Sequence, residues 1–204
     1  MVRPRTVSDE EVLAATAGVL RRHGPAGTTL AAVAREAGVS APALVHRFGS
    51  KRGLLLAFAA RAAAGVADGF AAARAGTASP LAALHAALAA DVADAEDRDE
   101  VAHDLGFLQL DLTDEEFRAH AATHAHRTRE GIARLLAEAV RARELRASTP
   151  TDALARTVHV ASHGALVLWA LAGTAPLREE LRAAVDAALD PHRTRTRRAP
   201  GGPP

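Results

Sequence analysis

The chain has 204 residues, no cysteine, and 25 Lys and Arg against 24 Asp and Glu, for a formal net charge of +1. The lack of cysteine excludes disulfides, cysteine-ligated zinc fingers and thiol nucleophiles. The length suits one or two small domains with a sizeable core. Alanine is abundant, aromatic residues are scarce, and neither a strand pattern nor a signal-peptide core occurs, which predicts an all-α protein in a cytoplasmic setting.

The first predicted helix begins at Ser8, which has capping-box spacing with Glu11. The apolar stripe of this helix consists of Val12, Leu13, Val19 and Leu20. Thr16 lies on the same face, where its hydroxyl can bond back to the carbonyl of Val12. Gly24 and Pro25 end the pattern.

Two further short helices, joined by a tight turn, are predicted between Thr28 and Lys51. Thr29 caps the first and Ser40 caps the second, because a hydroxyl accepts from an otherwise unpaired N–H. Gly38 suits the turn between them, and Pro42 falls in a first turn, where its missing N–H is harmless. This is the sequence form of a helix-turn-helix, which lays its second helix in the DNA major groove.

The rest of the chain predicts a larger helical body. Further helices are predicted over Lys51–Ala75 and about Pro80–Ala95, Asp97–Leu110, Asp114–Arg143, Thr151–Ala172 and Pro176–Leu189, with Thr113 as the cap of the long one. We expect a helix-turn-helix domain over residues 1–50, a helical-bundle regulatory and dimerisation domain over 51–190, and a disordered basic tail over 191–204.

Charge is unevenly distributed along the chain. Residues 1–60 carry eight Lys and Arg against four acids, a net charge of +4, whereas residues 90–118 carry eleven acids against two Arg, a net charge of −9. A positive first domain suits a phosphate backbone, and an acidic body is repelled by it.

The segment HGPAGTTLAAVAREAGVSAPALVHRFGSKRGLLLAF, within Val12–Phe58, resembles the N-terminal domain of the TetR family of transcriptional regulators. The matching pieces are the Gly before Thr-Thr, the A-G-V-S turn, the Pro-containing second helix, its Phe and the S-K-x-x-L-L run. The resemblance implies a dimeric regulator that binds double-stranded DNA and responds to a small molecule.

By position, the resemblance also implies contacts with DNA. It places Ala41, Pro42, Ala43, His46 and Arg47 in the major groove, Thr29, Ser40 and Lys51 on phosphates, and Val45 near the backbone. Val45 departs from the family, which usually has Tyr there and gains a hydrogen bond from it. Arg47 can donate twice to guanine, and alanine can pack on a thymine methyl. Alternatively, the alanines are only helix formers and Arg47 only solvates the surface.

Two apolar stripes near the C-terminus predict a homodimer interface. They consist of Leu154, Val158, Ala161, Ala165 and Leu168, and of Leu177, Leu181, Val185 and Leu189. The residues 157–177 contain no Asp, Glu, Lys or Arg, which favours a helix buried on two faces over a membrane span. The alternative for both stripes is ordinary core within one chain.

A ligand pocket is expected in the body, with large or polar side chains on alanine-rich helices as its candidate lining. They are His103, Phe107, Leu108, His163 and Trp169. Because such pockets are mostly apolar, we expect an apolar or aromatic ligand. His120 and His124 have the i,i+4 spacing of a zinc pair, but a closed site needs more ligands, so no metal or cofactor is predicted.

These observations predict a repressor that binds a palindromic operator as a dimer and is released by a small ligand. No nucleophile elbow, P-loop or dinucleotide fingerprint indicates an enzyme. Two alternatives stay open. The first is a DNA-binding protein without a ligand that is either constitutive or controlled by a partner. The second is a helical ligand carrier or enzyme with a vestigial DNA-binding domain.

Overall fold

The computed structural model describes residues 7–90, 92 and 98–194. These residues form α1 (Asp9–Gly27), α2 (Leu30–Ala37), α3 (Ala41–Phe48), α4 (Lys51–Ala75), α5 (Pro80–Ala90), α6 (Arg98–Thr113), α7 (Glu115–Arg141), α8 (Thr151–Ala172), α9 (Leu177–Leu189) and a 3-10 turn, η1 (Asp190–His192). The described part of the chain contains no strand, only an isolated bridge between Leu145 and Arg193. The predicted all-α fold is confirmed.

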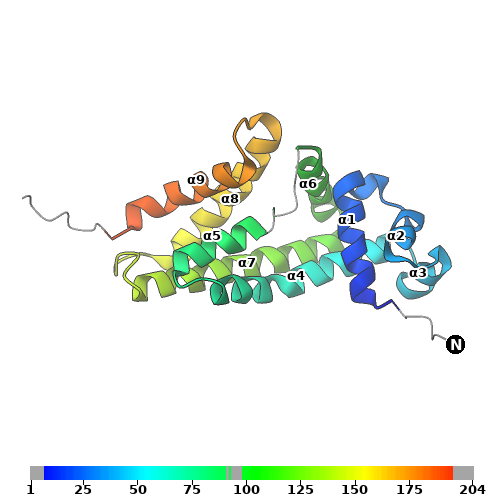
Figure 1. Cartoon of the computed structure of the whole chain (residues 1–204), viewed down its shortest axis with the longest axis horizontal. Helices are drawn as coiled ribbons and strands as arrows, with labels where there is room; N and C mark the ends of the chain where they lie inside the picture. Colours follow the sequence, from blue (N-terminus) through cyan, green and yellow to red (C-terminus); the bar gives the residue numbers. More distant parts are fainter. Residues whose placement is uncertain (1–6, 91, 93–97, 195–204) are drawn as a thin grey trace, which may run out of the picture.

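The helices α1, α2 and α3 form a small head at one end of the molecule (Figure 1). Val12, Val33 and Leu44 are fully buried in its core, and Leu54 of α4 completes it. The predicted capping box is confirmed, since Ser8 N donates to the Glu11 carboxylate at 2.8 Å and Glu11 N donates to Ser8 Oγ at 3.2 Å. Local sequence therefore sets where the head begins.

The break at Gly24 and Pro25 shapes the end of α1. Gly24 has φ +63°, a left-handed conformation that favours glycine, and helical structure resumes briefly from Pro25 to Gly27. A Cβ on Gly24 would lie 3.1 Å from the His103 ring of α6. Both the backbone conformation and the close approach of α6 therefore require glycine here.

One long helix, α4, connects the head with the body (Figure 1). Leu54 packs in the head, Leu55 packs with Leu20 and Phe117 at the junction, and Phe70 packs in the core of the body. Among the described residues, α4 is also the one helix that is long and apolar enough to cross a membrane. Because it supplies side chains to all three clusters, α4 is a structural helix of this fold.

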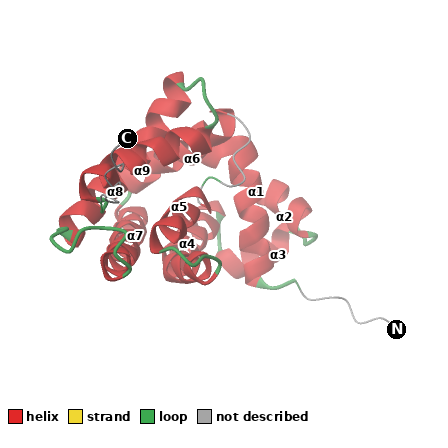
Figure 2. Ribbon diagram, turned by 60° about the vertical axis from the view of Figure 1, so that its left-hand side comes forward, coloured by secondary structure: helices red, strands yellow, loops and turns green. Residues whose placement is uncertain are grey.

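The body consists of α5, α7, α8 and α9 together with the rest of α4 (Figure 2). Leu84, Ile132, Leu136 and Val185 are fully buried in its core. Helix α6 lies between head and body, where it packs on α1, α7 and α8. A change in the position of α6 can therefore be transmitted to the head.

Several predicted helix ends differ from the structure. Helix α5 ends at Ala90, short of the expected Ala95; residues 91 and 93–95 lie outside the described part of the chain. The predicted cap Thr113 is wrong, because Asp114 accepts from Glu116 N at 3.0 Å and caps α7. The Thr113 hydroxyl instead donates to Gln109 O at 2.6 Å and belongs to the end of α6.

The chain after α9 folds back on the body as far as it is described. Arg146 N donates to His192 O at 2.9 Å, and the Thr194 hydroxyl donates to Arg143 O at 2.7 Å. A disordered tail was expected from Pro191, so residues 191–194 differ from that expectation because these hydrogen bonds hold them. Residues 195–204 lie outside the described residues.

Candidate functional site

Local hydrogen bonds cap α2 and α3, the two short helices joined by the tight turn. Thr29 Oγ1 accepts from Ala32 N at 3.1 Å, and Ser40 Oγ accepts from Ala43 N at 3.3 Å. Gly38 closes the turn with φ +70°. Both predicted caps are thus present. Each hydroxyl keeps its own proton, which it can donate to a phosphate.

The two faces of α3 differ in burial. Leu44 is fully buried and fixes the helix to the head, whereas Pro42, Val45 and His46 are exposed, Val45 to 48%. Ala41 and Ala43 are half-buried, and Ala41 packs on the head core. The outer face of α3 therefore offers Pro42, Val45 and His46 most openly, with the two alanines behind them.

Arg47 is turned toward the start of α1. Its guanidinium donates to Val7 O at 2.8 Å and lies 3.5 Å from the Asp9 carboxylate, with 26% of the side chain exposed. The sequence predicted that Arg47 faces the major groove, with surface solvation as the alternative. Nothing local in the sequence indicated the contacts with Val7 and Asp9, which join residues about forty positions apart. In this structure the guanidinium stabilises the head.

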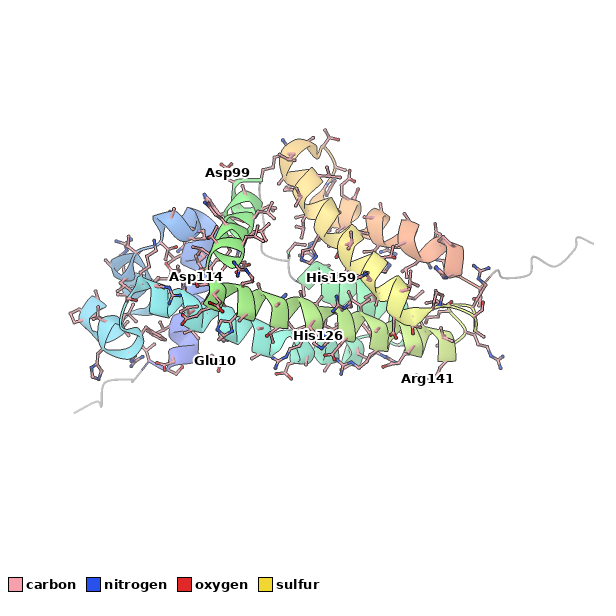
Figure 3. All side chains as sticks on the ribbon, turned by 180° about the vertical axis from the view of Figure 1, so that it is seen from behind. Glu10, Asp99, Asp114, His126, Arg141 and His159 are labelled. Atoms are coloured by element: carbon pink, nitrogen blue, oxygen red, sulfur yellow. The ribbon has the colours of Figure 1, made fainter. Side chains whose placement is uncertain are left out.

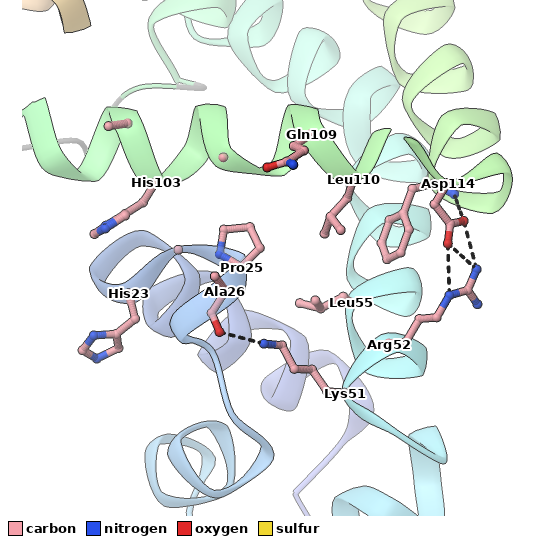
Figure 4. Close-up of a pocket in the computed structure, with 14 residues that line it drawn as sticks. His23, Pro25, Ala26, Lys51, Arg52, Leu55, His103, Gln109, Leu110 and Asp114 are labelled. Atoms are coloured by element: carbon pink, nitrogen blue, oxygen red, sulfur yellow. Dashed lines mark hydrogen bonds and ion pairs between the residues drawn. The ribbon is translucent and has the colours of Figure 1, made fainter. Parts of the chain in front are cut away.

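Lys51 lies in the first turn of α4, at the edge of the head. Its Nζ donates to Ala26 O at 3.0 Å, which ties α4 to the last turn of α1 (Figure 4). Ser50 caps the helix by accepting from Gly53 N at 3.1 Å. The ammonium group therefore stands beside a helix N-terminus, where the helix dipole favours an anion.

A cavity of about 910 Å³ opens between α4, α6, α7 and α8. We call it the effector cavity, after the ligand that the sequence analysis expects in the body. Phe107, Leu108 and His163 line it, as the sequence predicted. Phe58 of α4 and His159 of α8 also line it and were missed. His159 is four residues before His163, a helical spacing that would have placed both on one face.

Two predicted lining residues lie elsewhere. His103 does not line the effector cavity, because its Nδ1 donates to Arg21 O at 2.8 Å and holds α6 against α1. Trp169 also points away from the cavity, since its Nε1 donates to Ala175 O at 2.7 Å and its ring packs on the body core. A buried indole N–H usually finds such a partner, and here that partner fixes the ring.

Four histidines line the effector cavity. They are His120 and His124 of α7 and His159 and His163 of α8. The rings of His159 and His163 meet edge to face at 4.6 Å. Burial, and next the neighbouring His163, lower the pKa of His159 to about 4. Its Nε2 is buried and has no hydrogen-bond partner among the described residues. His159, labelled in Figure 3, is therefore neutral near pH 7.

One carboxyl group, that of Asp111, also lines this cavity. Burial raises the pKa of the Asp111 carboxyl above its usual range. Within the described residues, no group of three or more His, Cys, Asp or Glu side chains is placed to hold a metal ion. His120 and His124 are both half-buried cavity residues rather than a solvated pair.

The stripes expected to form a dimer interface lie mostly inside the chain, so that expectation is wrong for most of their residues. Fully or nearly fully buried in the body core are Leu154, Val158, Leu177, Leu181, Val185 and Leu189. Ala161 and Ala165 are half-buried, and only Leu168 is exposed. The two stripes face each other because α8 and α9 pack together within one chain.

Another side of α8 is open and apolar, and it includes Leu168 of the predicted stripe. Val160, Leu168 and Leu171 are 67%, 68% and 73% exposed, and Val167 is also exposed. Val160, Val167 and Leu168 also line the effector cavity, whereas Leu171 lies outside it. These residues are three, four, seven or eight positions apart in the sequence, a helical spacing that places them along one side of α8. The sequence contained this pattern, but the equally regular stripe of Leu154 and Val158 obscured it.

Comparisons with known proteins agree with this geometry. The profile of a family described as "Bacterial regulatory proteins, tetR family" matches residues 12–58. A TetR transcription regulator from Haloarcula marismortui ATCC 43049 is 20% identical, over 91% of this chain and 98% of that chain, with a TM-score of 0.72. SmeT, the repressor of the Stenotrophomonas maltophilia multidrug efflux pump SmeDEF, is 20% identical, over 97% and 96%, with a TM-score of 0.66. None of the curated proteins is significantly similar.

An all-helical body that holds a cavity and carries a helix-turn-helix head defines a class of DNA-binding transcription regulators. The solved structures show that this fold extends over nearly the whole chain. The head, residues 12–58, matches the profile of the TetR family of transcriptional regulators, and the solved structures share the fold of the rest of the chain.

Proposed function

We propose that the protein is a cytoplasmic repressor that binds operator DNA as a homodimer and releases it when a small, largely apolar ligand occupies the effector cavity. The proposal rests on the position of α4, because this one helix has Lys51 in its first turn at the head and Phe58 in the effector cavity. These positions are two helical turns apart, about 10 Å. A ligand that moves this part of α4 therefore moves the head.

In this proposal residues 1–50 bind DNA and residues 51–190 regulate and dimerise. The major-groove surface is the outer face of α3, where His46 and Val45 are exposed. Thr29 and Ser40 reach phosphates through their remaining hydroxyl protons, and Lys51 does so through its ammonium group. Arg47 joins them by exchanging the Val7 carbonyl for a base or a phosphate.

The dimer is proposed to form through the exposed apolar face of α8. A run of large apolar side chains such as Leu168 and Leu171 is uncommon on the surface of a monomer and marks an interaction site. A two-fold axis at this face repeats the same contact on both copies. It also requires a near-palindromic operator with half-sites about one helical turn, roughly 34 Å, apart.

The lining of the effector cavity supports an apolar or aromatic ligand. Phe58, Phe107 and Leu108 supply apolar surface, and neutral His159 offers one unpartnered polar atom. A structure of SmeT that is 20% identical to this chain is described as a complex with triclosan. Such walls bind by burial of apolar surface, with the few polar groups fixing orientation.

The direct test is recovery of bound genomic fragments by the purified protein, followed by titration of the recovered operator at increasing salt. Lys51→Ala is expected to weaken binding to all sequences and to lower the slope of log K against log salt by about 0.9, the loss of one phosphate contact. Arg134→Ala, an exposed cation on α7 far from the head along the chain, serves as the control. No salt-sensitive affinity of the wild-type protein for any duplex would refute the proposed function.

A further inference from the structure

A second cavity lies where the head meets the body, between the end of α1, the start of α4 and α6 (Figure 4). We call it the junction cavity. Its volume is about 770 Å³, within the roughly 300–1,000 Å³ of small-molecule sites. Leu55, Leu110 and Phe117 give it an apolar wall, and it shares no lining residue with the effector cavity.

The walls of the junction cavity are held in place by contacts between elements. His103 Nδ1 donates to Arg21 O at 2.8 Å, and the ring lies over Gly24, so α6 is fixed against the end of α1. Across the cavity, Arg52 of α4 pairs with Asp114, the cap of α7. The space is therefore bounded by fastened elements on both sides.

The acid that lines the junction cavity is already neutralised. Arg52 donates to both oxygens of Asp114, at 2.8 and 2.9 Å from Nη2, and to Glu116 at 2.7 Å. The hydrogen bonds from Arg52 lower the pKa of Asp114 below its usual range, so the carboxylate is ionised and paired. A ligand meets this group as an ion pair rather than as a free negative charge.

Lys51 is the cation of the junction cavity that lacks a carboxylate partner in the described part of the chain. Its Nζ makes one hydrogen bond, at 3.0 Å to Ala26 O. An ammonium group has three donors, so two remain for an anion. Lys51 lies at the cavity edge, with Leu55 and Leu110 beyond it (Figure 4).

We propose that the junction cavity is a second ligand site, which takes an amphipathic organic anion. The hydrocarbon part packs on Leu55 and Leu110, and the anionic group accepts hydrogen bonds from Lys51 Nζ. Apolar surface beside one unpaired cation is the complement of such a molecule. On the proposed function, where Lys51 contacts phosphate, the bound anion competes with DNA for the same ammonium group.

The test uses the full chain with 12-bromododecanoate as the probe and 12-bromododecanol as its uncharged counterpart. In titration calorimetry, Lys51→Gln is expected to weaken binding of the acid roughly tenfold, the value of one hydrogen bond to a charged group. Binding of the alcohol stays unchanged. Ala102→Phe, which fills the cavity from α6, weakens both probes, and Arg134→Gln weakens neither.

Anomalous diffraction from the bromine atom locates the probe. A peak beside Leu55 and Leu110 supports the junction cavity. A bromine peak confined to the effector cavity, or an equal loss of acid and alcohol in Lys51→Gln, would overturn the proposal. Circular dichroism confirms that each variant is folded, and Lys51→Gln, a surface substitution, keeps the test open if Ala102→Phe does not fold.

The DNA arm separates this site from the proposed function. If 12-bromododecanoate lowers the affinity for operator DNA in the wild-type protein but not in Ala102→Phe, the competition is supported. If the protein binds no DNA at all, the proposed function fails while calorimetry and diffraction still decide whether the junction cavity is a ligand site. If the probe binds there and DNA affinity is unchanged, the competition through Lys51 is refuted.

Discussion

Arg47 can serve two surfaces with one side chain. In this structure it donates to Val7 O and lies near Asp9. A guanidinium has five donors, so these contacts leave others free, and rotation about its long stem can bring them to guanine. The structural role and the recognition role are therefore separable by experiment.

We predict that Arg47→Ala relaxes the preference at a single base pair, at a cost of about 1–3 kcal/mol for the preferred base. Affinities for a set of operator variants, each with one base pair changed, measure this. Asp9→Ala is the matched control, since it loosens Arg47 from α1 without removing the guanidinium. An equal loss for all variants would instead assign Arg47 to the backbone or to the head itself.

His159 makes a prediction about pH. Its pKa in the folded chain, about 4, lies below the ordinary histidine value of 6.5, chiefly because the ring is partly buried. The unfolded chain therefore takes up the proton first, so the stabilising contribution is complete above pH 6.5 and is lost as the pH falls toward 4. Because the ring is only half-buried, solvent screening limits the effect to about 1–2 kcal/mol.

The free energy of unfolding in urea, measured at pH 7 and pH 4.5, tests this linkage. We expect a smaller acid-induced loss in His159→Leu than in the wild-type protein. His126→Gln is the control, because His126 is exposed and near Glu130. An identical pH dependence in His159→Leu and wild type would show that His159 does not carry the effect.

At the scale of helices, the sequence predicts those ends that local hydrogen bonds decide. Ser8, Thr29, Ser40 and Ser50 cap their helices within three residues of themselves, so spacing alone identifies them. The boundary between α6 and α7 could not be predicted from spacing, because Thr113 and Asp114 are adjacent and have similar propensities to cap a helix. In the structure Asp114 caps α7, and it also pairs with Arg52, which is distant in the sequence.

Periodicity identified apolar helix faces but not what they pack against. The stripes through Val158 and Val185 have the spacing of an interface, and they are the contact between α8 and α9 in one chain. Only the folded chain, with the neighbouring helix in place, distinguishes a stripe in a dimer interface from a stripe in the core of one chain. The remaining face of α8, with Leu168 and Leu171, then becomes the interface candidate.

We predict that Leu171→Glu converts a dimer to a monomer without unfolding it, because Leu171 is exposed in one chain and apolar burial at the two-fold contact would be lost. Sedimentation with circular dichroism tests both parts. Leu112→Glu, on α6, is a control with a similarly exposed leucine. Leu181→Glu would instead unfold the chain, since it places an unpaired charge in the core. A Leu171→Glu dimer would move the interface elsewhere.

At the scale of the whole molecule, the site depends on space that no single segment encodes. The effector cavity is bounded by four helices, and small residues of α4, α7 and α8, among them Ala59, Ala125 and Gly164, leave its space open. The sequence predicted Phe107, Leu108 and His163 because they stand out on their own helices. It misplaced His103, whose partner is a backbone carbonyl eighty-two residues away.

Coupling between this cavity and the head requires that a ligand favour one arrangement of α4 over another. A large side chain that fills the effector cavity excludes the ligand, so the ligand can no longer favour one arrangement of α4. We predict that Ala125→Phe, which lines the effector cavity, weakens binding of the uncharged aromatic probe N-phenyl-1-naphthylamine and abolishes any loss of operator affinity that this probe causes. Probe fluorescence and operator titration measure the two effects on the same samples.

Ala102→Phe, in the junction cavity, is the matched control with the same substitution on another helix. It should leave both the probe affinity and the operator response as in the wild-type protein, because an uncharged aromatic molecule gains nothing from Lys51. If Ala102→Phe removes the response and Ala125→Phe keeps it, the ligand acts at the junction beside the head. The helix α4 would then transmit no signal from Phe58, and release would follow from contacts at its first turn alone.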